Sequence, residues 1–434
     1  MRIYTSCIDN GALKEFVCGP GTDTSVQTAA QPLLCETHMP EGLNSAIEQI
    51  TEVDDKIMLI ARRNGSVQLV SRELKSEQED KPSVSEFSLL DTVSGLLDNS
   101  RLDPFNASSK KRTKLVDGFL SIASINDEGD YLVGTKSGLI HIIKLRTDKL
   151  EKLNTLEVRA PLDFVQFYDI ERTNSPTFAC GGEENLVRLF EIQKNYSEII
   201  NIWEAKNVKN DRLDMRVPVW PVALKFFKPM STDSPGYDSS KPNFQFVVIT
   251  KWSHLGIYKT QHGKRPLKYI DLLPNREPLL QLEIIDPETN PLNFTPEKNY
   301  LSADINNFEF ITTDLKRDVM RFNQNGRLIS KYGRGDITGA ATHISIYNQK
   351  YLLQGGLDRY LRVFKLSDRT ILDKIYVGAN INKIMIMEDD VEVEIIEKSN
   401  KKRSAKNEDE ESDEEDAEKL WSELEKKNKK KQKK

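Results

Sequence analysis

The side chains best suited to bind a partner are basic residues that stand beside an aromatic or another basic residue. An arginine can contact a phosphate while a neighbouring aromatic ring stacks on a base, so such groups are typical of local RNA contacts. The alternative is that each is an ordinary solvated loop charge. The candidates for RNA or partner binding are Arg212, Arg216, Trp220, Lys316, Arg317, Lys331 and Arg334.

Patterns that would support catalysis are missing from the sequence. It contains no phosphate-binding loop, no nucleophile elbow and no paired-histidine zinc motif. The four cysteines are widely scattered and have no histidines at zinc spacing, so we expect reduced thiols rather than a metal site. We therefore predict a protein that is not an enzyme and that has no cofactor and no bound metal.

The elements that must position the candidate residues repeat along the chain. One unit, an apolar strand, a Gly-rich or polar turn and an alternating outer strand, is clearest in residues 350–365, KYLLQGGLDRYLRVFK. Seven such hairpins at a spacing of roughly 40 to 50 residues are typical of a β-propeller. We predict an all-β, seven-bladed propeller over residues 1–397. The other six copies are 3–17, 56–72, 130–145, 177–192, 246–259 and 308–323.

Three polar stretches interrupt the regular spacing, near residues 74–115, 205–242 and 286–307. Strands inside a blade are packed on both sides, so insertions must leave through loops on the faces of the ring. We expect all three stretches to be loops of this kind.

A propeller leaves an open sheet edge unless one blade combines strands from both chain ends. The hairpin at 3–17 is a complete unit, and the β-rich stretch 373–387 follows the last internal copy without a full hairpin of its own. We expect 373–387 to supply the inner strands of the N-terminal blade, so that the two ends emerge close together.

The composition changes after Glu397. Residues 398–434 hold 13 basic and 11 acidic side chains and almost no apolar ones, which predicts a disordered tail. Its basic end is a candidate nuclear localisation signal and nucleic-acid-binding patch, and the alternative is a tail that only increases solubility. Residues 1–397 keep 49 basic and 56 acidic side chains, so this net-acidic body can contact RNA only locally. The candidate nuclear localisation signal in the tail comprises Lys426, Lys427, Lys429, Lys430, Lys431, Lys433 and Lys434.

No apolar run reaches the length of about 18 to 20 residues that a membrane span needs, and the first residues do not follow the pattern of a signal peptide. We expect a soluble, intracellular monomer.

The hairpins GGLDRYLRVFKL and CGGEENLVRLFEI resemble degenerate WD repeats in which Phe-Lys or Phe-Glu replaces Trp-Asp. The segments RIYTSCIDNGALKEF and KYLLQGGLDRYLRVF, together with the basic tail, resemble the nucleolar WD-repeat assembly factors of the large ribosomal subunit, the fungal Nsa-one family and vertebrate WD-repeat protein seventy-four. The resemblance covers the whole chain.

The resemblance implies a seven-bladed propeller in nucleolar pre-60S particles, with no catalytic activity. The implied partners are ribosome-assembly proteins and pre-rRNA, and a nuclear AAA-type ATPase would release the protein from the particles. The implied location is the nucleus and nucleolus. Because the Trp-Asp pairs are absent, the hydrogen-bond network of ordinary WD blades cannot be transferred to this chain.

Two other classes of function stay open. A WD-repeat adaptor in another nuclear complex, either a ubiquitin-ligase substrate receptor or a chromatin reader, would use the same fold. An enzyme centred on the channel of the ring is the third class, but no residue pattern argues for it.

Overall fold

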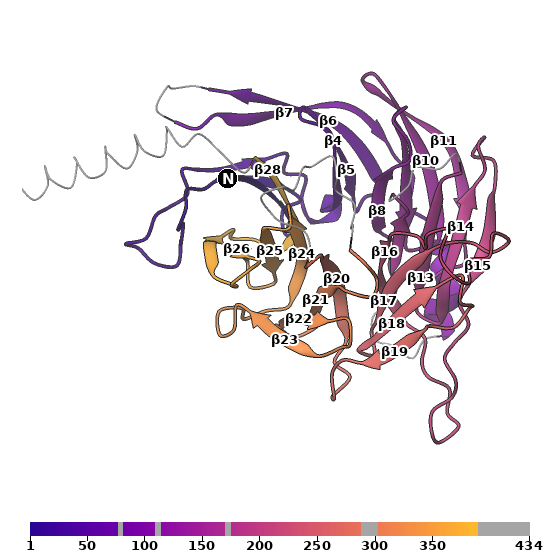
Figure 1. Ribbon diagram of the computed structural model, residues 1–434. Helices are drawn as coiled ribbons and strands as arrows, with labels where there is room; N and C mark the ends of the chain where they lie inside the picture. The colour runs from indigo at the N-terminus through magenta and orange to yellow at the C-terminus, as the bar shows by residue number, and fades with distance from the viewer. Residues whose placement is uncertain (77–80, 109–113, 170–174, 288–302, 389–434) are drawn as a thin grey trace, which may run out of the picture.

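The computed structural model describes residues 1–76, 81–108, 114–169, 175–287 and 303–388. Within these residues the strands form seven four-stranded antiparallel sheets, arranged as blades around a central channel (Figure 1). The prediction of an all-β, seven-bladed propeller is confirmed. No helix among the described residues is long and apolar enough to cross a membrane.

Each blade is a meander that runs from the channel to the outer rim, and we number the blades from the one that contains β4. Blade 1 comprises β4 (Ile47–Asp54), β5 (Ile57–Arg62), β6 (Ser66–Lys75) and β7 (Val84–Val93). Blade 2 comprises β8 (Phe119–Ser124), β9 (Asp130–Thr135), β10 (Leu139–Arg146) and β11 (Lys149–Glu157). Blade 3 comprises β12 (Phe164–Phe167), β13 (Thr177–Gly182), β14 (Asn185–Ile192) and β15 (Ile199–Glu204).

The remaining blades follow the same plan, except that the last one draws on both chain ends. Blade 4 comprises β16 (Pro221–Phe227), β17 (Gln245–Thr250), β18 (His254–Lys259) and β19 (Lys268–Asp271). Blade 5 comprises β20 (Leu279–Ile285), β21 (Glu309–Asp314), β22 (Val319–Asn323) and β23 (Leu328–Tyr332). Blade 6 comprises β24 (Ala341–Tyr347), β25 (Tyr351–Gly356), β26 (Tyr360–Lys365) and β27 (Ile371–Tyr376). Blade 7 comprises β28 (Ile381–Glu388), β1 (Arg2–Cys7), β2 (Leu13–Val17) and β3 (Leu34–His38).

The hydrophobic core lies between neighbouring blades rather than inside one of them. Phe227 and Val247 of blade 4, for example, belong to one buried cluster with Leu282 and Phe310 of blade 5. Each blade is therefore covered on both faces, which lets the core grow around the ring as blades are added.

The seven predicted hairpins are the two central strands of each blade, and the expectation that the second strand of each hairpin is an outer strand was wrong. Central strands have a strand on either side and a blade against either face, so they carry the apolar runs that the sequence displays. Every residue of β9, β13 and β25 is buried. The turn between the central strands is tight: Gly138 has a φ of 79°, and a Cβ there would lie 2.5 Å from the Val158 carbonyl oxygen.

The ring closes by pairing the two ends of the chain, as predicted. In the antiparallel register of β28 and β1, Ile386 lies opposite Ile3 and Glu388 lies opposite Arg2. Figure 1 shows the N-terminus directly beside β28.

The expectation that 373–387 forms several inner strands of blade 7 was wrong in part. Only β28 joins the N-terminal hairpin, whereas β27 is the rim strand of blade 6. Gly378, with a φ of 79°, lies in the segment between these two strands. The loop between β2 and β3 also crosses from blade 7 to this rim, where the Lys374 N–H donates to the Thr22 carbonyl at 2.8 Å.

The polar stretch 74–115 contributes more than a loop. It contains β7, and the connection from β7 to β8 contains the 3₁₀ helix η2 (Asn99–Leu102) and the short helix α1 (Asp103–Ser108); a further 3₁₀ helix, η1 (Leu43–Ser45), precedes β4. The stretch 205–242 contains β16 between two loops. Most of 286–307 and all of 389–434, including the nuclear localisation signal, lie outside the described residues.

Candidate partner-binding site

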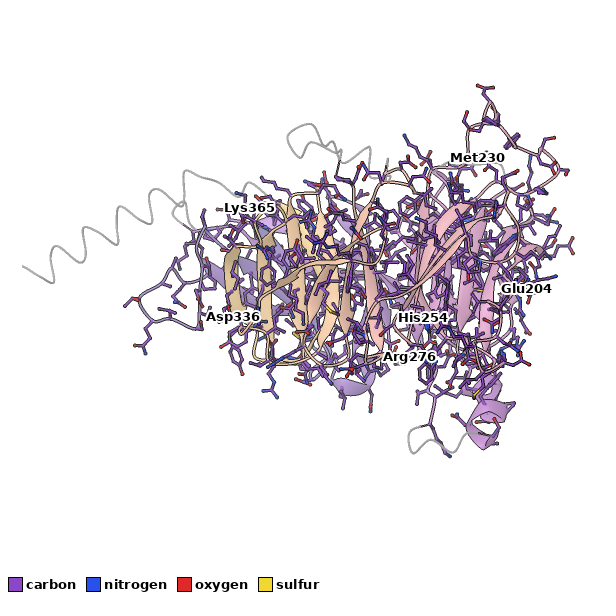
Figure 2. All side chains as sticks on the ribbon, turned by 60° about the horizontal axis from the view of Figure 1, so that its bottom comes forward. Glu204, Met230, His254, Arg276, Asp336 and Lys365 are labelled. Atoms are coloured by element: carbon purple, nitrogen blue, oxygen red, sulfur yellow. The ribbon has the colours of Figure 1, made fainter. Side chains whose placement is uncertain are left out.

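The meander topology assigns every loop to one of two faces of the ring. Because strand direction alternates, the turn between the two central strands lies on the same face as the connection to the next blade. We call this the interblade face. In Figure 2, Asp336, His254 and Arg276 mark the interblade face along the lower side, whereas Met230 and Lys365 lie on the opposite face.

The structure brings six of the seven predicted residues to the interblade face. Arg212, Arg216 and Trp220 belong to the connection from β15 to β16, Lys316 and Arg317 to the central turn of blade 5, and Arg334 to the connection from β23 to β24. Lys331 lies instead on the rim strand β23. The six residues therefore spread over blades 3 to 6 along one face, although nothing in their sequence spacing indicated this.

Three of the predicted cations are already neutralised by carboxylates. Arg216 pairs with Glu184 at 2.8 Å, Lys316 pairs with Glu277 at 2.7 Å, and Lys331 pairs with Asp318. The hydrogen bond and charge of Glu277 raise the pKa of Lys316.

The other three cations are open to solvent. Arg212, Arg317 and Arg334 are exposed and form no ion pair within the described part of the chain. These three are therefore the predicted cations best placed to contact a phosphate or a carboxylate.

Trp220 is held by two interactions of its own. The indole Nε1–H donates to the Asp163 Oδ2 atom at 2.7 Å, and the Lys251 ammonium lies 4.4 Å from the ring centroid. One face of the ring therefore already carries a cation. The role of Trp220 in stacking on a base stays a prediction.

A hollow of about 510 Å³ lies at the rim between blades 3 and 4. Four of its lining side chains are basic, Lys206, Arg216, Lys264 and Arg265, and we call it the basic hollow. Its walls are joined by backbone: the Lys206 N–H donates to the Lys264 carbonyl at 2.7 Å. The other lining residues are Leu186, Glu204, Ala205, Asn207, Val208 and Asn210.

The charges of the basic hollow are only partly balanced. Glu204 pairs with Arg188 at 3.0 Å, and Arg265 Nε–H donates to the Asn207 carbonyl at 3.0 Å. Lys206 and Lys264 have no ion-pair partner among the residues that the structure describes. No sequence pattern pointed to Lys206, Lys264 or Arg265, because they come together only through the packing of two blades.

The channel holds a second group of charges. Lys225 of β16 pairs with Glu283 of β20 at 2.9 Å, and burial lowers the pKa of Lys383 in β28 to about 8. Burial and the Lys383 charge also hold the pKa of His343 well below its usual value. In the described residues, no cluster of three or more potential metal ligands is present here or elsewhere.

The fold and the site define the class of protein. It is a seven-bladed β-propeller, whose candidate binding residues lie on its loops and rim. No model of a protein family matches the chain.

Full-length relatives identify the family. The chain is 57% identical to the ribosome biogenesis protein NSA1 of Candida glabrata over 100% of both chains. The identity is 45% to that of Saccharomyces cerevisiae, covering 91% of this chain and 90% of the relative, and 39% to that of Eremothecium gossypii, covering 98% and 97%. The chain therefore belongs to the ribosome biogenesis protein NSA1 family.

Two solved structures are more distant. The WD40 β-propeller domain of Doa1 aligns with a TM-score of 0.48 and 12% identity over 78% of this chain and 84% of that chain. Saccharomyces cerevisiae Sqt1 aligns with a TM-score of 0.48 and 10% identity over 78% and 76%.

Proposed function

We propose that this protein is a non-catalytic scaffold in the nucleolar assembly of the large (60S) ribosomal subunit. The observation that carries the proposal is the similarity, over the full length of both chains, to proteins named for ribosome biogenesis. In this role the propeller binds assembly factors and pre-rRNA within pre-60S particles, and it takes no part in chemical steps.

The geometry suits a scaffold. Each blade presents a central turn and an interblade connection on one face, and the central turns are held by strands that are buried on both sides. Preordered loops lower the entropy lost on binding. Since the body outside the tail is net acidic, RNA contacts are confined to exposed cations such as Arg212, Arg317 and Arg334.

In this proposal the tail carries the nuclear import signal. The seven lysines between Lys426 and Lys434 direct the protein to the nucleus, where it enters the nucleolus and joins the particle. A nuclear AAA-type ATPase then releases it.

Sequencing of bound RNA tests the proposal. The tagged full-length protein is purified from nuclear extract, and precursors of large-subunit rRNA are the expected RNA species. Ubiquitin-ligase subunits or histones in place of these precursors would overturn the proposal in favour of another WD-repeat adaptor. A double variant, Arg317→Glu and Arg334→Glu, which leaves the connection from β15 to β16 intact, is compared after ultraviolet crosslinking. Lower RNA yield from this variant with the same protein partners would locate the RNA contact on the interblade face.

A further inference from the structure

The connection from β15 to β16 contains a turn that holds its own shape. We call residues 209–216 the finger. The Asp211 Oδ1 atom accepts the backbone N–H groups of Leu213 at 2.8 Å and Met215 at 2.9 Å. The Asp211 N–H donates to the Met215 carbonyl at 2.9 Å, and the Asn210 amide donates to Asp214 Oδ1 at 2.9 Å. Hydrogen bonds within the finger therefore fix the turn around Leu213, and the Arg216–Glu184 ion pair ties its end to blade 3.

Two apolar side chains stand out from the finger. Leu213 is 80% exposed and Met215 is 62% exposed, the highest values among the large hydrophobic residues of the described chain. Single exposed apolar residues are ordinary on protein surfaces. Here two lie in one turn whose backbone is already fixed, so a partner that covers them gains their burial at little cost in loop ordering.

The basic hollow adjoins these apolar side chains. Asn210 and Arg216 belong to the finger and also line the hollow. Lys206 and Lys264 bring positive charge to the same place, and neither is paired with a carboxylate of the described residues. The surface thus combines two exposed apolar side chains with an adjacent excess of positive charge.

We propose that the finger and the basic hollow together bind an acidic, amphipathic segment of a protein partner. Apolar side chains of the segment cover Leu213 and Met215, and its carboxylates bind Lys206 and Lys264. This inference rests on the proposed scaffold function and assigns one of its protein contacts.

The composition of the surface favours protein over RNA. Stacking on bases requires an aromatic or guanidinium plane, which leucine and methionine do not offer. The two arginines that line the hollow are already engaged, Arg216 with Glu184 and Arg265 with the Asn207 carbonyl. Among the described residues no aromatic side chain lines the basic hollow, and one face of the nearby Trp220 ring carries the Lys251 ammonium. Apolar side chains and free lysines side by side match a segment that alternates apolar residues with carboxylates.

Site-specific photocrosslinking in cells tests the inference. Leu213 of the full-length protein is replaced by p-benzoylphenylalanine, and the crosslinked material is mapped by mass spectrometry. A control carries the same group at Lys241, which lies in the loop from β16 to β17 on the opposite face. The expected product is a single protein segment rich in carboxylates and apolar residues, absent from the control. Crosslinks to RNA alone, or no product specific to position 213, would overturn the inference.

A second measurement uses the crosslinked segment as a synthetic, fluorescently labelled peptide. Fluorescence anisotropy with the purified full-length protein should show binding that weakens at least tenfold in the pair L213S and M215S, and again in the pair K206E and K264E. Equal affinity for all variants would overturn the inference. Because these readouts do not depend on which particle contains the partner, they separate failure of this contact from failure of the ribosomal assignment.

Discussion

The Arg2 guanidinium of β1 donates to the Glu15 carboxylate of β2 inside the seam between blades 7 and 1, where the side chains are 1% and 0% exposed. Ser85 of β7 donates to Glu15 through its N–H at 3.1 Å and its hydroxyl at 2.8 Å. His38 of β3 lies 3.0 Å from the same carboxylate. One buried carboxylate therefore joins the closing blade to the blade that follows it.

Replacing Glu15 by glutamine should destabilise the propeller by about 3 to 5 kcal/mol, because it leaves the buried Arg2 charge without its main partner. Urea unfolding followed by circular dichroism measures the change. Glu86→Gln is the matched control: it removes the exposed Lys75–Glu86 pair on the hairpin of β6 and β7 and should leave stability unchanged. If E15Q unfolds at the wild-type urea concentration, the seam does not depend on this network.

The Asp373 carboxylate should give stability an unusual pH dependence. Burial raises its pKa from 3.8 to about 6, although the Thr22 N–H donates to it at 3.1 Å. The folded protein then holds more protons than the unfolded chain between about pH 4 and 6, so stability falls as pH rises through that window. Relative to the Asp373→Asn variant, the free energy of unfolding of the wild type should fall by about 2 to 3 kcal/mol between pH 4 and 7.

The control for this experiment is Asp368→Asn in the turn between β26 and β27. Hydrogen bonds from Thr370 lower the pKa of Asp368 to about 2, so its contribution changes only below about pH 4. Unfolding free energies of the three proteins at pH 4, 5, 6 and 7 provide the comparison. Parallel curves for wild type and D373N would show that Asp373 stays ionised throughout.

Two truncations should separate the contribution of the last strand to stability and solubility from that of the tail. A chain that ends at Glu388 keeps β28 and should melt within a few degrees of the full-length protein. A chain that ends at Asn380 lacks β28 and leaves β1 as an unpaired inner edge, which should give aggregation instead of a soluble monomer. Size-exclusion chromatography and thermal melting measure both. A soluble, monomeric chain ending at Asn380 would contradict closure through β28.

Nuclear accumulation should depend on the basic end of the tail. Replacement of the seven lysines between Lys426 and Lys434 by glutamine should shift a fluorescently tagged protein toward the cytoplasm without changing its melting temperature. Microscopy gives the distribution, and replacement of an equal number of acidic residues in 408–418 by glutamine is the control. Unchanged nuclear signal in the lysine variant would remove the role of this segment as an import signal.

The central hairpins could be predicted from the sequence because burial on every side forces long apolar runs. The rim strands could not. The β7 sequence VSEFSLLDTV is largely exposed on one face and appeared to belong to a polar insertion. The four-residue strand β19 is exposed or half-buried throughout and carries no apolar pattern.

The blade to which each strand belongs could not be predicted from the sequence either. A β-rich run such as 373–387 does not show that its first half completes blade 6 and its second half enters blade 7. The grouping of the candidate-site residues in space could not be predicted for the same reason. Arg212 and Arg216 were apparent as charges in a polar loop, whereas Lys264 lies far along the chain from Lys206 and meets it only in the folded ring. Leu213 and Met215 are apolar residues within that charged loop, and this contrast could have indicated an exposed contact site.

The pairing of β1 with β28 also sets an order for folding during synthesis. The Ser6 hydroxyl accepts the Lys383 N–H at 2.9 Å across 377 residues of chain. At about 5 to 20 residues per second, translation takes roughly 20 to 75 s to cover that distance. Until then the inner edge of β1 has no partner, and an unpaired strand edge can pair with other chains.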